Sequence, residues 1–306
     1  MRLLVVGAGA TGGYFGGRLA AAGRDVTFLV RSARAAHLRA HGLQIVSPHG
    51  NVTLAPQLVT ADTIPAPYDV VLLSVKAFGL EASLPDLASA VGPQTIILPV
   101  LNGMRHMDVL VARFGAEAVI GGVCKIAATL DDQGRVVQLA KFHELLYGEV
   151  GGAVTERMTR LDAFMQGAKF DARLSSAITR EMWEKWLFLA SLGAITCLMR
   201  GTIGEIAAAS GGADFARQLI AEIAAIVKAN SHTPSDTLLA EIAAALTAKG
   251  SPLTSSMYRD LERGNRIEAD QIIGDLLVRG RAKSVETPLL AAVYANLCVY
   301  QNRLAA

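Results

Sequence analysis

The sequence predicts an N-terminal α/β domain, built on a doubly wound parallel sheet, followed by an all-α C-terminal domain. Two observations support this fold class. In the first half of the chain, short apolar runs alternate with helical patterns, as expected for parallel strands buried on both faces. From residue 177 onward the apolar spacing is almost entirely helical. We therefore expect two domains, formed by residues 1–174 and residues 175–306.

The chain begins with a strand, a glycine-rich turn, a helix and a second strand. Residues 2–6 form the first apolar run, a helical pattern ends at Gly23, and residues 26–30 form the second run. The turn is a G-x-G-x-x-G motif that consists of Gly7, Ala8, Gly9, Ala10, Thr11 and Gly12. Between a strand and a helix, this motif is typical of a Rossmann-type dinucleotide-binding unit. The alternative is an ordinary glycine-rich turn.

Each glycine of the motif has a physical role in dinucleotide binding. Gly7 permits the tight turn out of the strand, Gly9 lets the backbone approach a pyrophosphate, and Gly12 lets the helix pack against the strand. The N-terminus of the helix then offers free N–H groups and a partial positive charge to the phosphates. We therefore expect the motif to bind the cofactor.

Arg31 ends the second strand. An acidic residue at this place, about 20 residues beyond the glycines, would bind the ribose 2′-hydroxyl of NAD. A carboxylate repels a 2′-phosphate, whereas a guanidinium binds phosphate with a fork of donors. The sequence therefore favours NADPH/NADP+ as the cofactor, and the alternative is a solvated arginine in a basic loop.

The elements that follow continue the alternation of strands and helices. Helices are expected over residues 34–40, 81–90 and 155–167, and strands over residues 43–46, 52–54, 69–75, 94–100, 118–123 and 170–174. A turn over residues 48–51 makes residues 43–46 and 52–54 a candidate hairpin. Residues 136–138 and 144–147 suggest an antiparallel pair of strands.

Three polar residues stand at the carboxyl ends of expected parallel strands, namely Arg31, Lys76 and Asn102. Ligands of doubly wound sheets bind beyond these ends. Lys76 is a candidate for the cofactor phosphates or ribose, and Asn102 for the nicotinamide end or the substrate. The alternatives are a solvated strand end for Lys76 and a turn residue for Asn102, because Asn-Gly is itself a turn sequence.

The composition limits the class of protein. Apolar residues make up 52% of the 306 residues, which is enough for a sizeable core, and the net charge of +2 argues against nucleic-acid or membrane-surface partners. Three widely spaced cysteines suggest a reducing compartment, and the histidines show no metal-ligand spacing. No apolar run approaches the length of about 18 residues typical of a membrane helix. We expect a cytoplasmic protein without a metal.

The C-terminal half carries six expected helices, over residues 178–199, 213–230, 235–248, 257–263, 266–283 and 288–303. The first of these has Lys185 between two tryptophans, and a later one has Glu268. A lysine and a glutamate from different helices are able to meet in a cleft that faces a nicotinamide. Most helical lysines and glutamates are simply solvated, and that alternative stays open on the sequence alone.

These motifs together resemble the ketopantoate reductases (2-dehydropantoate 2-reductases), which use NADPH. The resemblance covers essentially the whole chain, and each motif stands in the family's order and spacing. The motifs are the glycine turn with Arg31, Val75-Lys76-Ala77, Asn102-Gly103-Met104, Trp183-Glu184-Lys185, Ser255 to Asp260, and Arg266-Ile267-Glu268.

The resemblance implies a role for each matching residue. Lys185 looks like the general acid that protonates the developing alkoxide, and Glu268 looks like its partner, which also contacts the substrate. Ser256 resembles a substrate-binding serine, and Asn102 resembles an asparagine that bridges nicotinamide and substrate. Lys76 and Arg31 look like cofactor contacts.

One departure from the family pattern affects the substrate. The family has asparagines one and two helical turns after its lysine, where this chain has Leu189 and Gly193. Either other residues compensate, or the substrate differs from ketopantoate. The expected activity is NADPH-dependent reduction of 2-dehydropantoate to pantoate, in pantothenate and coenzyme A synthesis. The alternatives are a reductase of another 2-oxo acid or a non-catalytic NADPH-binding regulator, and the apolar helical half leaves a homodimer possible.

Overall fold

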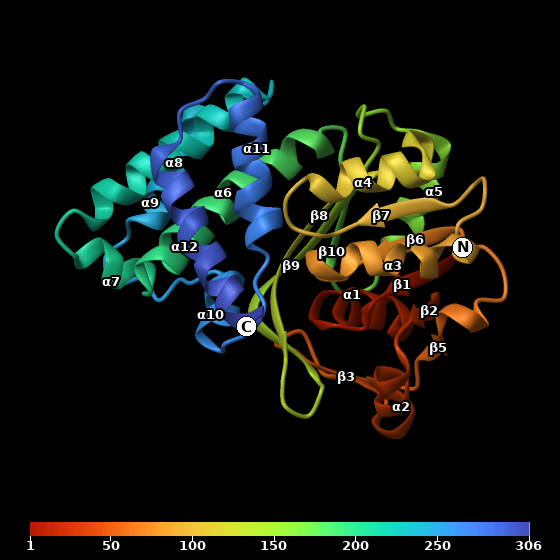
Figure 1. Cartoon of the computed structure of the whole chain (residues 1–306). Helices are drawn as coiled ribbons and strands as arrows, with labels where there is room; N and C mark the ends of the chain where they lie inside the picture. Colours follow the sequence, from red (N-terminus) through yellow and green to blue (C-terminus); the bar gives the residue numbers. More distant parts are fainter. Residues whose placement is uncertain (306) are drawn as a thin grey trace. The chain divides into compact units, whose positions relative to one another are not determined.

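The computed structural model describes residues 1–305, and the chain divides into two compact units (Figure 1). The first unit comprises residues 1–101 and 106–181, and the second comprises residues 102–105 with the chain from residue 182 onward. Helix α6 (Ile178–Met199) therefore begins in the first unit and continues in the second. The boundary expected after residue 174 stays a prediction.

A five-stranded parallel sheet forms one half of the first unit. Its strands, in spatial order, are β5 (Gln57–Val59), β2 (Asp25–Leu29), β1 (Arg2–Val6), β6 (Val70–Leu73) and β7 (Ile96–Pro99). All four pairings between neighbours are parallel. The central strands are apolar and almost fully buried, as expected for a sheet with helices on its faces. This sheet confirms the doubly wound α/β domain.

The strand order reverses direction at β1. The chain passes from β1 to β2 on one side, and later returns to place β6 on the other side of β1. In the register, Val6 lies opposite both Leu29 and Leu73. The carboxyl ends of β2, β1 and β6 therefore form a common edge, and such a reversal is where open α/β sheets bind ligands.

A second sheet completes the first unit. Its strands follow the order β10 (Asp171–Leu174), β9 (Val136–Gly148), β3 (Leu43–Val46) and β4 (Val52–Leu54), and β8 (Gly121–Leu130) also pairs with β9. The expected hairpin of residues 43–46 and 52–54 is confirmed as the antiparallel pair β3 and β4. Helix α1 (Ala10–Ala21) contacts strands of both sheets, and its buried Tyr14 and Phe15 belong to the common core.

The expected pairing between residues 136–138 and 144–147 is wrong, because both stretches belong to the single long strand β9. The antiparallel partner of β9 is β8, with Cys124 opposite Leu145. The turn between the two strands lies earlier, where Gly134 has a φ of +72° and its N–H donates to the carbonyl oxygen of Asp131. The strand expected over residues 118–123 begins later than predicted, since β8 starts at Gly121, and it belongs to the second sheet.

Besides α1, the described part of the first unit contains four α-helices and several short 3-10 turns. These are α2 (Ser32–His41), α3 (Leu80–Leu87), α4 (Arg105–Phe114), α5 (Glu156–Met165), η1 (Ala61–Thr63), η2 (Ala77–Gly79), η3 (Ala88–Ala90) and η4 (Ala116–Ala118), with α4 starting at the junction with the second unit. Helices α2, α3 and α5 match the expected ones within a few residues. Helix α4 was not expected.

The second unit is helical, which confirms the all-α prediction. After α6 come α7 (Ile203–Ala208), α8 (Gly212–Ala229), α9 (Asp236–Leu246), α10 (Ser256–Glu262), the π-helical turn η5 (Asp270–Gly274), α11 (Asp275–Ala282) and α12 (Pro288–Ala305). The helix expected over 266–283 is corrected, because residues 265–268 are not helical and the first turn is a π turn. Within residues 1–305, no helix is long and apolar enough to cross a membrane.

Candidate functional site

The glycine turn lies at the reversal point of the parallel sheet, between β1 and α1. Gly7 has a φ of +92°, in the left-handed region that favours glycine. A Cβ on Gly12 would lie 2.1 Å from Oγ of Ser74 and 2.2 Å from the carbonyl oxygen of Gly7, so no side chain fits there. A Cβ on Gly9 would meet no atom within 4 Å. The fold requires Gly7 and Gly12, whereas the open space at Gly9 is available to a ligand.

Two polar residues, Ser74 and Arg34, hold the glycine turn, and no local pattern in the sequence indicates this role. The hydroxyl of Ser74 lies 2.9 Å from the carbonyl oxygen of Val6 and 3.1 Å from that of Gly7. The Nε of Arg34 donates to the carbonyl oxygen of Ala8 at 3.2 Å, and its Nη2 donates to that of Gly134 at 3.0 Å. Burial lowers the pKa of Arg34, which still leaves a full positive charge at neutral pH beside the turn.

The N-terminus of α1 is free of side-chain caps among the described residues. Gly9 occupies the cap position and has no side chain to accept from the first N–H groups of the helix. These N–H groups and the helix dipole therefore stay available to an anion. Together with the charge on Arg34, they give this edge of the sheet a positive potential suited to phosphate.

Arg31 and Lys76 follow the strands on either side of β1. Arg31 comes two residues after β2 and precedes α2, and Lys76 comes three residues after β6 and precedes η2. Both side chains are exposed. Parallel strands in register put them at the same edge as the glycine turn, which is the placement that the sequence predicts for cofactor contacts.

Asn102 and its neighbours follow β7 but belong to the second unit. Gly103 has a φ of +80°, and a Cβ there would lie 2.6 Å from the carbonyl oxygen of Gln271. The chain at residues 102–103 therefore packs closely against η5. Asn102 is half-buried.

Lys185 lies on α6 between two anchored tryptophans. The indole Nε1 of Trp186 donates to the carbonyl oxygen of Ile272 at 2.9 Å, and Trp186 is almost completely buried. The Trp183 ring stacks on His232 with centroids 4.9 Å apart, and the Arg279 guanidinium lies 5.8 Å from the centroids of both indoles. These contacts fix the helix on both sides of the half-buried Lys185.

Glu268 is the last residue before the helical segment that contains η5. Only 9% of its surface is exposed, and its carbonyl oxygen accepts from the N–H of Ile272 at 2.9 Å. Since Trp186 donates to the same Ile272, the structure joins the element that bears Lys185 to the element that bears Glu268. A buried carboxylate needs a charged or hydrogen-bonding neighbour, as at many catalytic sites.

Of the two adjacent serines, Ser255 has a structural role. Its hydroxyl caps α10 by accepting from the N–H of Tyr258 at 2.9 Å, and it lies 3.0 Å from the hydroxyl of Thr196 on α6. Ser256 is exposed at the first position of α10. The sequence-predicted substrate serine is therefore not the one that caps the helix.

Leu189 and Gly193 give α6 an apolar surface one and two turns beyond Lys185. A Cβ on Gly193 would lie 2.9 Å from Cε of Met257, so the Met257 side chain fills the space beside the helix. Met257 is buried, with 3% of its surface exposed. At these two positions α6 offers no amide to a ligand.

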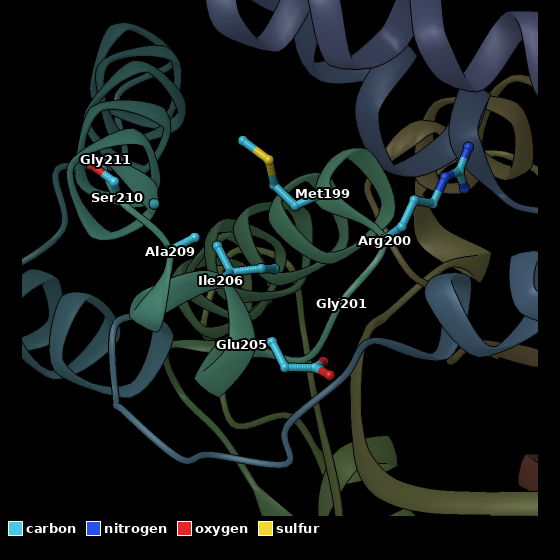
Figure 2. A pocket seen from close by; sticks show the side chains of 9 residues that line it. Met199, Arg200, Gly201, Glu205, Ile206, Ala209, Ser210 and Gly211 are labelled. Carbon is cyan, nitrogen blue, oxygen red and sulfur yellow. The ribbon is translucent and has the colours of Figure 1, made fainter.

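A hollow of about 450 Å³ lies at the far end of α6, away from Lys185 in the sequence (Figure 2). It is lined by Met199, Arg200, Gly201, Glu205, Ile206, Ala209, Ser210, Gly211 and Gly212. None of the predicted site residues is among them. The Glu205 carboxylate is committed to the capping box of α7, where it accepts from the N–H of Thr202 at 2.7 Å. We assign no ligand to this hollow.

The first unit has a parallel sheet with a dinucleotide-type glycine turn, and the helical unit that follows carries a lysine and a buried glutamate. This arrangement is typical of two-domain oxidoreductases. The family model described as ketopantoate reductase PanE/ApbA matches residues 3–152, and the model of its C-terminal part matches residues 177–301. The chain belongs to the ketopantoate reductase PanE/ApbA family of oxidoreductases.

Individual relatives extend this result over the whole chain. An uncharacterized oxidoreductase of Bacillus subtilis, YkpB, is 38% identical over 301 residues, which cover 98% of this chain and 99% of that protein. The crystal structure of 2-dehydropantoate 2-reductase from Methylococcus capsulatus is similar with a TM-score of 0.88 and 29% identity, covering 100% of this chain and 98% of the other. D-mandelate dehydrogenase, in a ternary structure with NADH and anilino(oxo)acetate, shares the fold at a TM-score of 0.89, 21% identity and full coverage of both chains.

Proposed function

We propose that this protein reduces a 2-oxo acid to the 2-hydroxy acid with NADPH, and that 2-dehydropantoate, which gives pantoate for pantothenate and coenzyme A synthesis, is the first substrate to test. The observation that carries the proposal is the hydrogen bond between Trp186 and Ile272. It joins the helix of Lys185 to the turn of Glu268, and so supports the two residues as one acid–base pair. The family and its 2-dehydropantoate 2-reductase member support the substrate class.

The residues around the glycine turn fit a dinucleotide with a 2′-phosphate. The space at Gly9 admits a pyrophosphate, and the uncapped N-terminus of α1 offers it donors. Arg31, rather than an acidic residue, follows β2, and an exposed guanidinium suits a 2′-phosphate better than a 2′-hydroxyl. When bound, NADPH supplies the hydride for the 2-oxo carbon. Lys76 and Asn102 are its further expected contacts.

The helical unit supplies the proton and holds the substrate. As negative charge grows on the carbonyl oxygen, the Lys185 ammonium stabilises it and transfers a proton to it. The Glu268 carboxylate favours the charged form of the lysine. The hydroxyl of Ser256 and the amide of Asn102 donate to the oxygens of the 2-oxo acid, and the buried tryptophans keep α6 from moving when charge develops.

A second candidate substrate follows from the apolar surface of α6. Leu189 and the Met257 side chain beside Gly193 suit an alkyl or aryl group, and they leave a substrate hydroxyl without a partner. A 2-oxo acid with an apolar side chain is therefore the main competitor of 2-dehydropantoate. The fold itself does not decide between them, because D-mandelate dehydrogenase has the same fold.

A steady-state screen with NADPH tests the proposal. Initial rates with 2-dehydropantoate, 2-oxoisovalerate, benzoylformate and pyruvate are compared for the wild-type protein and for Lys185→Ala. We expect turnover that depends on Lys185. A kcat/KM for 2-dehydropantoate no better than that for the other acids would favour the second candidate. Tight NADPH binding without turnover of any of these acids would favour a non-catalytic NADPH-binding regulator instead.

A further inference from the structure

Gln271 is a buried polar residue without an assigned role. It is only 6% exposed, and its amide nitrogen Nε2 is buried without a hydrogen-bond partner among the residues that the structure describes. Buried amides are nearly always paired, because an unpaired donor has lost its bonds to water and gained none in return. An orphaned donor beside a proposed active site therefore points to an acceptor that arrives with a ligand.

The backbone around Gln271 brings it to the predicted catalytic residues. It follows Glu268 by three residues, within the π turn η5, where the N–H of Asp275 donates to the carbonyl oxygen of Asp270. Turns of this type recur at functional sites. The side chain runs beside the Asn102–Gly103 segment, since its Cγ lies 3.5 Å from where a Cβ on Gly103 would be.

The next residue of η5 fixes the turn against α6. Ile272 follows Gln271, and its carbonyl oxygen accepts from Trp186, the neighbour of Lys185. Segments with three predicted site residues therefore meet at one turn. These are the segment of Asn102, the helix of Lys185 and the turn after Glu268. Gln271 lies at their meeting point.

The substrate carboxylate accepts further donors besides Ser256 and Asn102, because its two oxygens offer about four acceptor sites. A 2-oxo acid brings a carboxylate, which a buried Glu268 repels. The ammonium of Lys185 is used by the 2-oxo oxygen in the proposed reaction. Helix α6 has Leu189 and Gly193 where amides would stand in the family pattern. An amide N–H is a suitable donor to a carboxylate, and a hydrogen bond to a charged acceptor is stronger than a neutral one.

We propose that Gln271 binds the substrate carboxylate through its Nε2 and replaces part of the amide set that α6 lacks. The inference rests on the proposed function, because it assumes that a 2-oxo acid is the substrate. It adds a substrate-binding residue on the π turn and assigns that residue to one group of the substrate.

Kinetics with paired substrates test this assignment. Gln271→Leu removes the donor at similar size, and Gln271→Glu replaces it with a group that repels an anion. Each variant is assayed with 2-oxoisovalerate against its methyl ester and with ketopantoate against its neutral lactone. We expect Gln271→Leu to lower kcat/KM for the acids by about 10- to 100-fold, mainly through KM, with a much smaller loss for the ester and lactone. Gln271→Glu should lower it further for the acids alone.

Three controls separate the possible outcomes. Gln218→Leu makes the same chemical change at an exposed position of α8 and should leave both substrate types unaffected. NADPH affinity and Tm should change little in the Gln271 variants. Equal losses for acids and neutral analogues would mean a structural role and overturn the inference, as would unchanged kinetics. If the wild type turns over no 2-oxo acid, the proposed function fails and the inference fails with it.

Discussion

The indole Nε1 of Trp186 donates a 2.9 Å hydrogen bond to the carbonyl oxygen of Ile272. A π turn departs from the regular i to i+4 ladder of an α-helix, and η5 receives this additional donor from another helix. The bond therefore stabilises an irregular turn and, in the same contact, fixes the element next to Lys185 against the element next to Glu268.

Trp186→Phe should uncouple these two elements while it keeps most of the apolar packing. Loss of the indole N–H leaves a buried carbonyl oxygen without that donor, which costs about 1–3 kcal/mol of unfolding free energy. We expect kcat to fall while NADPH affinity stays near that of the wild type, measured by steady-state kinetics and fluorescence titration. Trp183→Phe is the matched control, because Trp183 donates no such bond to η5. An unchanged kcat for Trp186→Phe would contradict the positioning role.

Lys185→Ala should lower kcat by about 10²- to 10⁴-fold, as removal of a general acid typically does. NADPH binding should be nearly intact, since the glycine turn belongs to a separate compact unit. Single-turnover rates and NADPH titrations give the two quantities separately. Equal loss of turnover and NADPH affinity would argue against Lys185 as the acid.

Arg31→Ala should weaken NADPH binding much more than NADH binding. The exposed guanidinium is expected to contact only the 2′-phosphate, which NADH lacks. Arg34→Ala provides the contrast, because Arg34 donates to the carbonyl oxygen of Ala8 and so supports the turn for either cofactor. Dissociation constants of both cofactors for both variants check this. An equal loss of NADPH and NADH affinity in Arg31→Ala would mean that Arg31 does not contact the 2′-phosphate.

The sequence was sufficient for the parallel sheet and for the helical unit, because glycine spacing and apolar periodicity are local patterns. The predicted strand pairing was wrong at β9, because this one long strand contains two apolar stretches. Its partner is β8, which precedes it across the turn at Gly134. The side chains that hold or complete the candidate site could not be predicted from the sequence either. Ser74 and Arg34 act on backbone atoms that are distant in the sequence, and no local pattern distinguishes Gln271 from a solvated glutamine.

His143 should make the stability of the first unit depend on pH. Burial and, next, the nearby His49 lower the pKa of His143, whose Nδ1 lies 2.7 Å from the Tyr14 hydroxyl and whose ring stacks on His49. Above the pKa of about 6.5 in the unfolded state, the imidazole is neutral in both the folded and the unfolded protein. The contribution of His143 to the free energy of unfolding is then fully present. As the pH falls from about 6.5 through the lower pKa of the folded state, the unfolded state takes up the proton first. The free energy of unfolding therefore decreases over this range.

His143→Asn should reduce that loss between pH 7.5 and 5.5, although it lowers stability at pH 7.5 through the lost stacking. Urea unfolding at both pH values measures the effect. His41→Asn, at an exposed histidine of α2, should retain the pH dependence of the wild type. The same decrease in stability for wild type and His143→Asn would exclude His143 as its source.

Gly193→Asn tests how the surface of α6 selects the substrate. The added side chain meets Cε of Met257, the flexible end of a side chain, which has room to shift only at the expense of its own burial. The new amide lies on the Lys185 face of the helix, two turns on, and offers a partner for a substrate hydroxyl. A neutral hydrogen bond contributes about 0.5–1.5 kcal/mol, so kcat/KM for ketopantoate relative to 2-oxoisovalerate should rise about two- to tenfold. Leu189→Asn should act in the same direction, and a ratio that stays constant in both variants would show that this face of α6 does not contact the substrate side chain.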